Sequence, residues 1–443
     1  MKSFLRNINE ENIHQTILLL LVFVGVILAV LFWQKDTLSV YDASGHLAAV
    51  ESMRNFWPLP AGWNSKELLG WPQGLFYPSL FHYLGATLSF VFDSESAIRI
   101  LISIALVSLP LTINEFSKIF IKDRSWSTLA TVLLFSLLLF IPDYLGVGVR
   151  GIFRVGLLSS FFVMPFVFLF FAQIPKVLTG KFLTASLLLA VLLLTHFVAG
   201  LIAGFFLVTA IFGHYLLKKN LLLLPLLKIV VISAALTSFF FLPFFFYRQY
   251  ASITAPEISS YFLANLVGFV IAVLLLVVSY RKKQQPLFVL ALTSCGLLFF
   301  VSIDAVATRL FGFQSMTHNF YLFRFQPFAY IFFLVSVVSF VFSNTVVNRK
   351  FINYALISCL GLLVIGLVIK NPAQVRTAQV SLEADKGVSG RFLESFRRLQ
   401  TSPAYYELQT GLNRKNPEAN WANGLFAESS VNSSFIQSLI KSL

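Results

Sequence analysis

An acidic side chain and an imidazole stand four residues apart in the run Tyr41-Asp42-Ala43-Ser44-Gly45-His46. This spacing places Asp42 and His46 on one face of a helix, where both can act on the same ligand. The pair follows the first long apolar run, which ends at Trp33, so it lies where a membrane helix returns the chain to water. Ionisable groups near membrane segments are commonly functional, although Asp42 would also suit a helix N-cap and His46 an interfacial position.

The composition indicates a membrane protein. Charged residues make up 12% of the chain and hydrophobic residues 57%, and the mean hydropathy is +0.81. The apolar runs are far longer than barrel strands, so we expect an all-α polytopic membrane protein. The net charge of +14 comes from Lys and Arg residues that are scattered between the apolar runs. They are typical of topology markers and lipid-phosphate contacts, and we expect no nucleic-acid partner.

Basic residues also orient the chain. Lys2 and Arg6 precede the first span, which predicts an N-terminus inside and Asp42 outside. The segment 75–92 is apolar enough to cross the membrane but contains Pro78 and His82, and we interpret it as a juxtamembrane or re-entrant helix. The inner loops then carry twelve basic residues and the outer loops after residue 96 six, which supports this topology.

This topology predicts about eleven spans within a transmembrane domain of residues 1–370. The first outer loop, residues 34–96, would hold the juxtamembrane helices, and the polar residues 371–443 would form an outer tail. The spans are expected near 13–33, 97–115, 126–142, 156–173, 182–195, 199–217, 226–246, 261–280, 286–303, 327–343 and 351–369.

The six outer basic residues are all arginines, whereas most of the inner ones are lysines. Bidentate recognition of a phosphate favours the guanidinium fork, so the outer face is suited to hold an anionic group such as a lipid phosphate. Each of these side chains could instead extend to ordinary lipid headgroups. The six are Arg99, Arg150, Arg154, Arg248, Arg309 and Arg324.

Two further features fall on the same face. Asp143 opens a glycine-containing loop that runs to Arg154, and glycines allow close backbone approach to a ligand. His196 falls at the outer end of a span, where a polar residue needs a partner, although this could be no more than a helix contact. The outer loop expected over residues 304–326 contains Arg324 between aromatic residues, which suits phosphate capture or a cation–π contact.

The order of these residues resembles that of a known family. Asp42-x-x-x-His46 is followed by Gly70-Trp71-Pro72-Gln73-Gly74-Leu75-Phe76-Tyr77-Pro78-Ser79-Leu80, then by Leu194-Thr195-His196 and the outer Arg324. Over roughly residues 10–370, the chain resembles the GT-C superfamily of membrane glycosyltransferases. Within it, the chain is most similar to the multi-pass membrane proteins labelled "6-pyruvoyl-tetrahydropterin synthase-related". It departs from the usual pattern at Ser79 and Phe197, where relatives usually carry prolines.

The resemblance implies sugar transfer from a polyprenyl-phosphate sugar on the extracytoplasmic face of the plasma membrane. Asp42 would be the catalytic acidic residue, and Asp143 a candidate for the second acidic position of several relatives. A divalent metal could bridge these two carboxylates, although no ligand spacing demands a cofactor. Residues 371–443 would match the start of a larger outer domain, so the chain is expected to be a fragment or a minimal member.

As a mechanism, we expect Asp42 to act as a base on the acceptor hydroxyl, with His46 orienting it or contacting the acceptor. Arg324, Arg150 or Arg154 would hold the lipid phosphate, and His82 and His196 would support the site. The acceptor is open to protein, lipid or glycan. The alternatives are a transporter or flippase of lipid-linked glycans and a non-catalytic scaffold of polysaccharide assembly.

Overall fold

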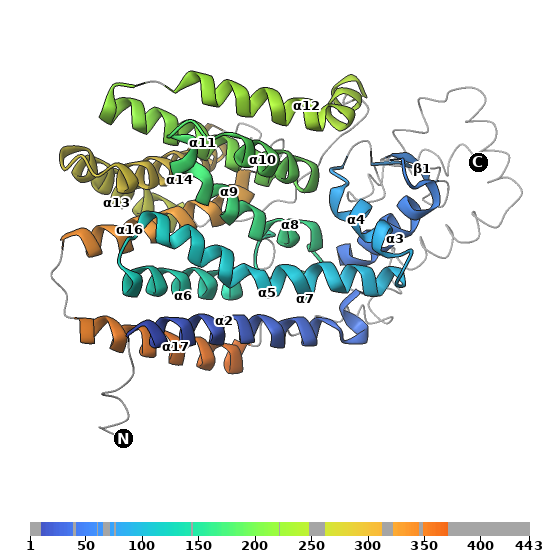
Figure 1. Cartoon of the computed structure of the whole chain (residues 1–443), viewed down its shortest axis with the longest axis horizontal. Coiled ribbons are helices and arrows are strands. Elements are labelled where there is room, and N and C mark those ends of the chain that lie inside the picture. The colour runs from blue at the N-terminus through green and yellow to red at the C-terminus, as the bar shows by residue number, and fades with distance from the viewer. Residues whose placement is uncertain are drawn as a thin grey trace, which may run out of the picture.

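The computed structural model describes residues 10–38, 41–59, 61–64, 71–74, 77–142, 145–220, 222–247, 262–311, 322–344 and 349–370. These ranges form a bundle of helices that run roughly alongside one another, with one small two-stranded sheet at an end of the bundle (Figure 1).

Eight of the described helical segments are long and apolar enough to cross a membrane, because a span needs about 20 apolar residues. The expectation of a polytopic helical membrane protein is therefore confirmed. The segments are α2 (Glu10–Phe32), α5 (Ser94–Phe120), α8 (Leu158–Phe162) continued by α9 (Met164–Val177), α11 (Phe197–Lys218), α12 (Leu223–Tyr247), α13 (Phe262–Arg281), α14 (Gln285–Phe311) and α16 (Gln326–Asn344).

Three more apolar helices are shorter or have shorter apolar segments: α6 (Arg124–Phe140), α10 (Leu183–Thr195) and α17 (Arg349–Lys370). Each of the segments expected from hydropathy falls on one of these long or short helices. One expectation about a boundary is wrong. α14 continues to Phe311 instead of ending near residue 303, because no glycine or proline interrupts the chain between Asp304 and Gly312.

A layer of phenylalanine rings holds the middle of the bundle together. Phe206 of α11 stacks on Phe332 of α16 at 4.6 Å between ring centroids and meets Phe171 of α9 at 4.8 Å. Phe116 of α5 lies 5.6 Å from Phe171. All four side chains are fully buried. Because lipid tails are as apolar as these rings, their close packing, and not exclusion of water, holds the four helices together.

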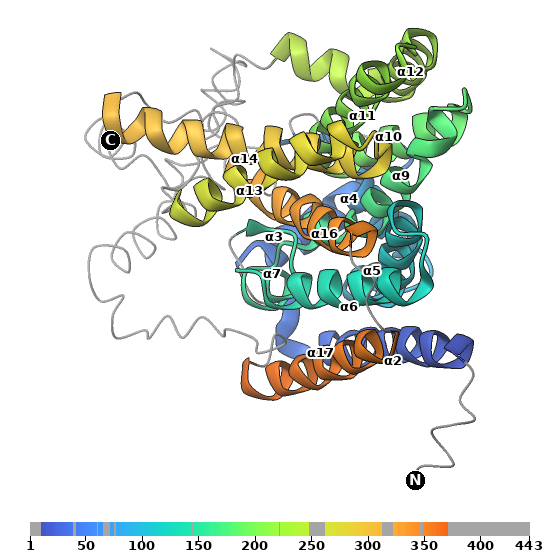
Figure 2. The same ribbon diagram turned by 90° about the vertical axis from the view of Figure 1, so that its left-hand side faces the viewer.

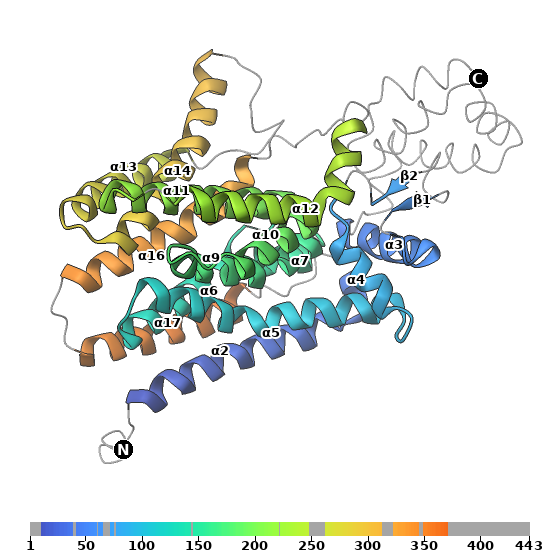
Figure 3. The same cartoon turned by 45° about the horizontal axis from the view of Figure 1, so that its top comes forward.

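The first and last helices flank this centre. α2 packs along α5 (Figure 3), where Gly25 allows the two backbones to approach so closely that a Cβ atom there would lie 2.6 Å from the Leu106 carbonyl oxygen. α17 packs against α6 (Figure 2), so the end of the described chain lies on the side of the bundle where it begins.

Between α2 and α5, short elements gather at one end of the long helices (Figure 1). They are η1 (Lys35–Leu38), α3 (Tyr41–Phe56), β1 (Gly62–Asn64), β2 (Trp71–Gln73) and α4 (Leu80–Leu88). The strands pair antiparallel with Trp63 opposite Pro72. α4 has 9 residues, too few to cross a bilayer, which agrees with a helix lying beside the membrane.

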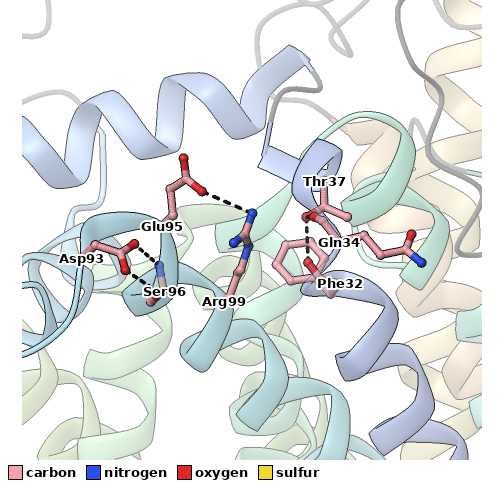
Figure 4. A network of polar contacts seen from close by, with 7 residues as sticks. All are labelled: Phe32, Gln34, Thr37, Asp93, Glu95, Ser96 and Arg99. Atoms are coloured by element: carbon pink, nitrogen blue, oxygen red, sulfur yellow. Dashed lines mark hydrogen bonds and ion pairs between the residues drawn. The ribbon is translucent and has the colours of Figure 1, made fainter.

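A polar network anchors the chain where it leaves α2 and enters α5 (Figure 4). The Thr37 hydroxyl bonds to the carbonyl oxygen of Phe32 at 2.7 Å, which closes the turn of η1. Asp93 caps α5 by accepting from the Ser96 amide at 2.8 Å. The Arg99 guanidinium lies 3.3 Å from the Glu95 carboxylate, on the side that faces η1. Arg99, which the sequence predicts on the outer face as an anion-binding residue, thus has an acidic partner in its own helix.

α3 is docked at its first turn onto a connection far along the chain. The Asp42 amide donates to the Val155 carbonyl oxygen at 2.9 Å, just after α7 (Val149–Arg154). Gly156 follows with a φ of +82°, and a Cβ atom there would lie 2.2 Å from the Ala43 nitrogen. Only glycine fits this backbone contact, so Gly156 sets where Asp42 lies.

Gly156→Ala is expected to lower the unfolding free energy by about 2 kcal/mol, because the added methyl group must push α3 away from its dock. Gly180→Ala is the matched control, since Gly180 has a similar φ of +89° but faces open space. It should cost only about 1 kcal/mol of backbone strain. Apparent melting temperatures in nanodiscs measure both, and equal losses would contradict the role of the Ala43 contact.

Candidate functional site

Two histidines form a direct pair between α3 and α4. Nδ1 of His46 lies 2.7 Å from Nε2 of His82, and the two rings are stacked with centroids 5.0 Å apart. His82 is 2% exposed and His46 is half-buried. Burial lowers the pKa of His46 to about 4, and burial also lowers the pKa of His82. Both imidazoles are therefore neutral near pH 7, and they share one proton in their hydrogen bond.

Tyr77 joins this pair to the transmembrane helices. Its ring lies beside both imidazoles, at 6.5 Å from His46 and 5.8 Å from His82. Its hydroxyl bonds to the buried Ser159 hydroxyl of α8 at 2.7 Å. Neither Tyr77 nor Ser159 was among the site residues expected from sequence. Their signal was weak, since Tyr77 belongs to the run that resembles the family but Ser159 is one of many serines in apolar helices.

The second part of the site is a bond between Arg324 and His196. His196 is the single residue between α10 and α11, where it adopts an extended conformation, and Arg324 belongs to η4 (Leu322–Phe325). Nη1 of Arg324 lies 3.3 Å from Nε2 of His196. Arginine can only donate, so Nε2 of His196 is the acceptor and its proton resides on Nδ1. Both sequence-selected residues are thus brought together by the fold.

The loop before α7 packs directly on the Arg324 guanidinium. Gly146 has a φ of +87°, and a Cβ atom there would lie 3.4 Å from Nη1 of Arg324. Its carbonyl oxygen accepts a 2.6 Å hydrogen bond from Ser160. Together with His196, these residues line a narrow crevice beside the guanidinium. Gly146 thus has a left-handed backbone conformation that favours glycine, and it lies beside the guanidinium.

Asp42 lies in the first turn of α3, not at its N-cap. The side chain is exposed to solvent, yet surrounding protein atoms displace part of its hydration. This desolvation raises the pKa of the carboxyl group, and the positive charge of Arg324 opposes the rise. Arg324 thus acts on the Asp42 carboxylate and on His196.

Five of the residues selected from sequence converge on this end of the bundle. The positive charge of Arg324 acts on both Asp42 and His196, which joins α3 to the second part of the site electrostatically. The five are Asp42, His46, His82, His196 and Arg324.

The other selected residues are placed less fully. Arg154 directly precedes Val155, whose carbonyl oxygen accepts the hydrogen bond from the Asp42 amide. Arg150 is half-buried in α7, and its Nε atom has no hydrogen-bond partner within the described ranges. Asp143, expected to share a metal with Asp42, lies outside the described residues. Within those residues, no group of three His, Cys, Asp or Glu side chains is arranged to hold a metal ion.

A buried polar cluster joins α13 to the start of α16, next to η4. Asn265 of α13 accepts from the Tyr330 hydroxyl at 2.8 Å and from the Gln326 amide at 3.2 Å, both in α16. Asn265 and Gln326 are almost completely buried. Polar groups inside a membrane domain are costly and commonly functional. This cluster was not among the site residues expected from sequence, although Gln326 and Tyr330 are four residues apart and share a helix face. The cluster fixes the start of α16, which follows Arg324 closely in the chain.

An apolar groove opens beside His196. Its lining includes Leu193, Phe197 and the α12 residues Val230, Phe241 and Phe245, and it encloses about 360 Å³. His196 therefore lines the crevice beside Arg324, while the next residue, Phe197, lines an apolar groove.

No protein-family model matches this chain, and no curated protein matches its sequence.

Asp42→Asn is expected to raise the apparent melting temperature at neutral pH. A raised folded pKa means that ionising Asp42 costs more in the folded than in the unfolded protein. Wild-type stability is therefore lost as the pH rises from about 3.8, the ordinary Asp value, to the folded pKa. The gap between variant and wild type should open over that window and stay constant above it.

Glu51→Gln removes another carboxylate from the exposed surface of α3 and is the control. Melting curves between about pH 3 and pH 8, a range that extends well above the ordinary carboxylate pKa of about 4, measure the difference. A variant that is less stable than wild type at neutral pH would contradict the direction of the Asp42 shift.

Proposed function

We propose that this protein is a membrane glycosyltransferase that moves a sugar from a polyprenyl-phosphate-linked donor to an acceptor hydroxyl. One observation carries the proposal: Arg324, held by His196, lies close enough to Asp42 to influence its ionisation. A cation suited to phosphate and a carboxylate suited to proton transfer are thus combined at one end of a membrane bundle.

The proposed chemistry is inverting transfer. Asp42 removes the proton of the acceptor hydroxyl as its oxygen forms a bond to the anomeric carbon. The bond from that carbon to the phosphate oxygen breaks, and Arg324 stabilises the departing polyprenyl phosphate. The raised pKa of Asp42 strengthens it as a base near neutral pH. Since phosphate is a good leaving group, positioning and charge supply most of the rate enhancement.

The proposal includes the GT-C-like architecture and the eleven-span topology. The N-terminus would be inside, and the site and residues 371–443 would lie on the extracytoplasmic face of the plasma membrane. Support comes from the apolar helices at the expected positions and from the distribution of Lys and Arg. Donor lipid and surrounding membrane lipids are the proposed partners. A divalent metal shared by Asp42 and Asp143 is a further option that the reaction assay should include.

Purified wild type in nanodiscs should release free polyprenyl phosphate from one member of a panel of polyprenyl-phosphate sugars, and Asp42→Asn should not. Glu51→Gln, on the same helix, should release it at the wild-type rate. Release by Asp42→Asn would remove Asp42 from the role of base. If wild type releases nothing with or without divalent metal, transport of lipid-linked glycans or a scaffold role would replace the enzyme proposal.

Arg324→Lys is expected to lower kcat/KM by roughly tenfold to a hundredfold, because lysine keeps the charge but loses the fork that can bind His196 and a phosphate together. Arg54→Lys is the control, since Arg54 lies over the Phe90 ring on the exposed side of α3. An unchanged kcat/KM in Arg324→Lys would exclude bidentate phosphate binding by this residue.

Arg324→Gln should also move the acid limb of the pH profile of kcat/KM to higher pH. The positive charge of Arg324 lowers the pKa of Asp42, so its removal lets that pKa rise further, and the base is then protonated at a higher pH. Arg324→Lys keeps the charge and should leave the limb in place. A shift in the opposite direction would contradict the coupling of the two residues.

A further inference from the structure

The hydrogen bond between His46 and His82 allows two arrangements of protons. In the first, Nδ1 of His46 donates to Nε2 of His82, and the one proton of His82 must then reside on its Nδ1. In the second, Nε2 of His82 donates to Nδ1 of His46. Nδ1 of His82 is then unprotonated, and His46 carries its proton on Nε2. The two arrangements give His46 opposite chemical properties.

The surroundings of His82 decide between them. Its Nδ1 atom is fully buried and has no hydrogen-bond partner among the residues that the structure describes. In the first arrangement this atom would be a buried N–H group without an acceptor; in the second it is an acceptor without a donor. Buried donors without a partner are the rarer and costlier case. The second arrangement is therefore favoured.

We propose that His82 is a positioning residue that holds His46 with its proton on Nε2, so that His46 presents an N–H donor to an oxygen atom of the ligand bound beside Asp42. Within the described ranges, the bond to His82 is the only hydrogen bond of His46, which leaves Nε2 available. The identity of that ligand as a lipid-linked sugar phosphate rests on the proposed function.

Arg324 is a second hydrogen-bond donor in this site. Arg324 donates to His196 and has further donors on its fork. With His46 also a donor, Asp42 is the group that accepts a proton, and His46 is excluded as the base at neutral pH. Donors on His46 and Arg324 together favour a ligand rich in acceptor oxygens, such as the phosphate and sugar oxygens of the donor.

The first test reads the protons directly and needs no activity. Histidine labelled with ¹⁵N in wild type in nanodiscs allows NMR to tell protonated from bare ring nitrogens, with His46→Gln and His82→Gln used for assignment. At neutral pH we expect a protonated Nε2 and a bare Nδ1 in His46, and a bare Nδ1 in His82. A protonated Nδ1 in His46 would overturn the proposal.

The second test uses two variants of His82 in the release assay. His82→Gln can place a side-chain N–H near the position of Nε2 and should keep kcat/KM within about threefold of wild type, whereas His82→Phe keeps the ring volume without a donor and should lose about tenfold. Both should keep the acid limb of the pH profile, which belongs to Asp42. His214→Phe, which removes the partner of Gln285, is the control.

These outcomes separate the two proposals. Equal activity of His82→Phe and wild type would overturn the positioning role while leaving the transferase function intact. If wild type itself releases no polyprenyl phosphate, the proposed function fails, but the NMR spectra still decide which ring of the pair donates. If His82→Phe does not fold, the spectra of wild type carry the decision alone.

Discussion

The docking of α3 onto the turn after α7 is the contact on which the site depends. The Asp42 amide bonds to Val155, and the absence of a side chain at Gly156 lets the two backbones touch. This contact fixes the first turn of α3 against helices that belong to the bundle. From there, the regular geometry of the helix carries His46 to the place where α4 supplies His82. A small error at Gly156 would displace both catalytic candidates at once.

The transmembrane helices give this dock a rigid base. The phenylalanine layer around Phe171, Phe206 and Phe332 joins α9, α11 and α16, and α8, which precedes α9, carries Ser159 against Tyr77. At the start of α16, the Asn265 cluster holds the helix in register. Arg324 is two residues away, so its position follows from buried hydrogen bonds and not from its own charge.

Part of the site could be predicted because it depends on local geometry. The four-residue spacing of Asp42 and His46 determines a shared helix face whatever the tertiary structure, and His196 and Arg324 could be selected from residue type and their place beside a span. The partnerships could not be predicted. The paired residues are far apart in the chain: 36 residues separate His46 from His82, 82 separate Tyr77 from Ser159, and 128 separate Arg324 from His196. Which of these chain segments meet depends on how the helices pack. The fold class followed from apolar runs, whereas the end of α14 was expected near residue 303 and lies at Phe311.

The long separation between Arg324 and His196 has a consequence for biogenesis. Asp42 and His46 emerge early in synthesis, but the guanidinium that influences Asp42 emerges only after most of the apolar helices have been made. Until then, Asp42 lacks the neighbouring cation and His196 lacks its donor. The nascent protein therefore passes through membrane insertion with an incomplete site, and Asp42, His196 and Arg324 come together only when the bundle is almost fully assembled.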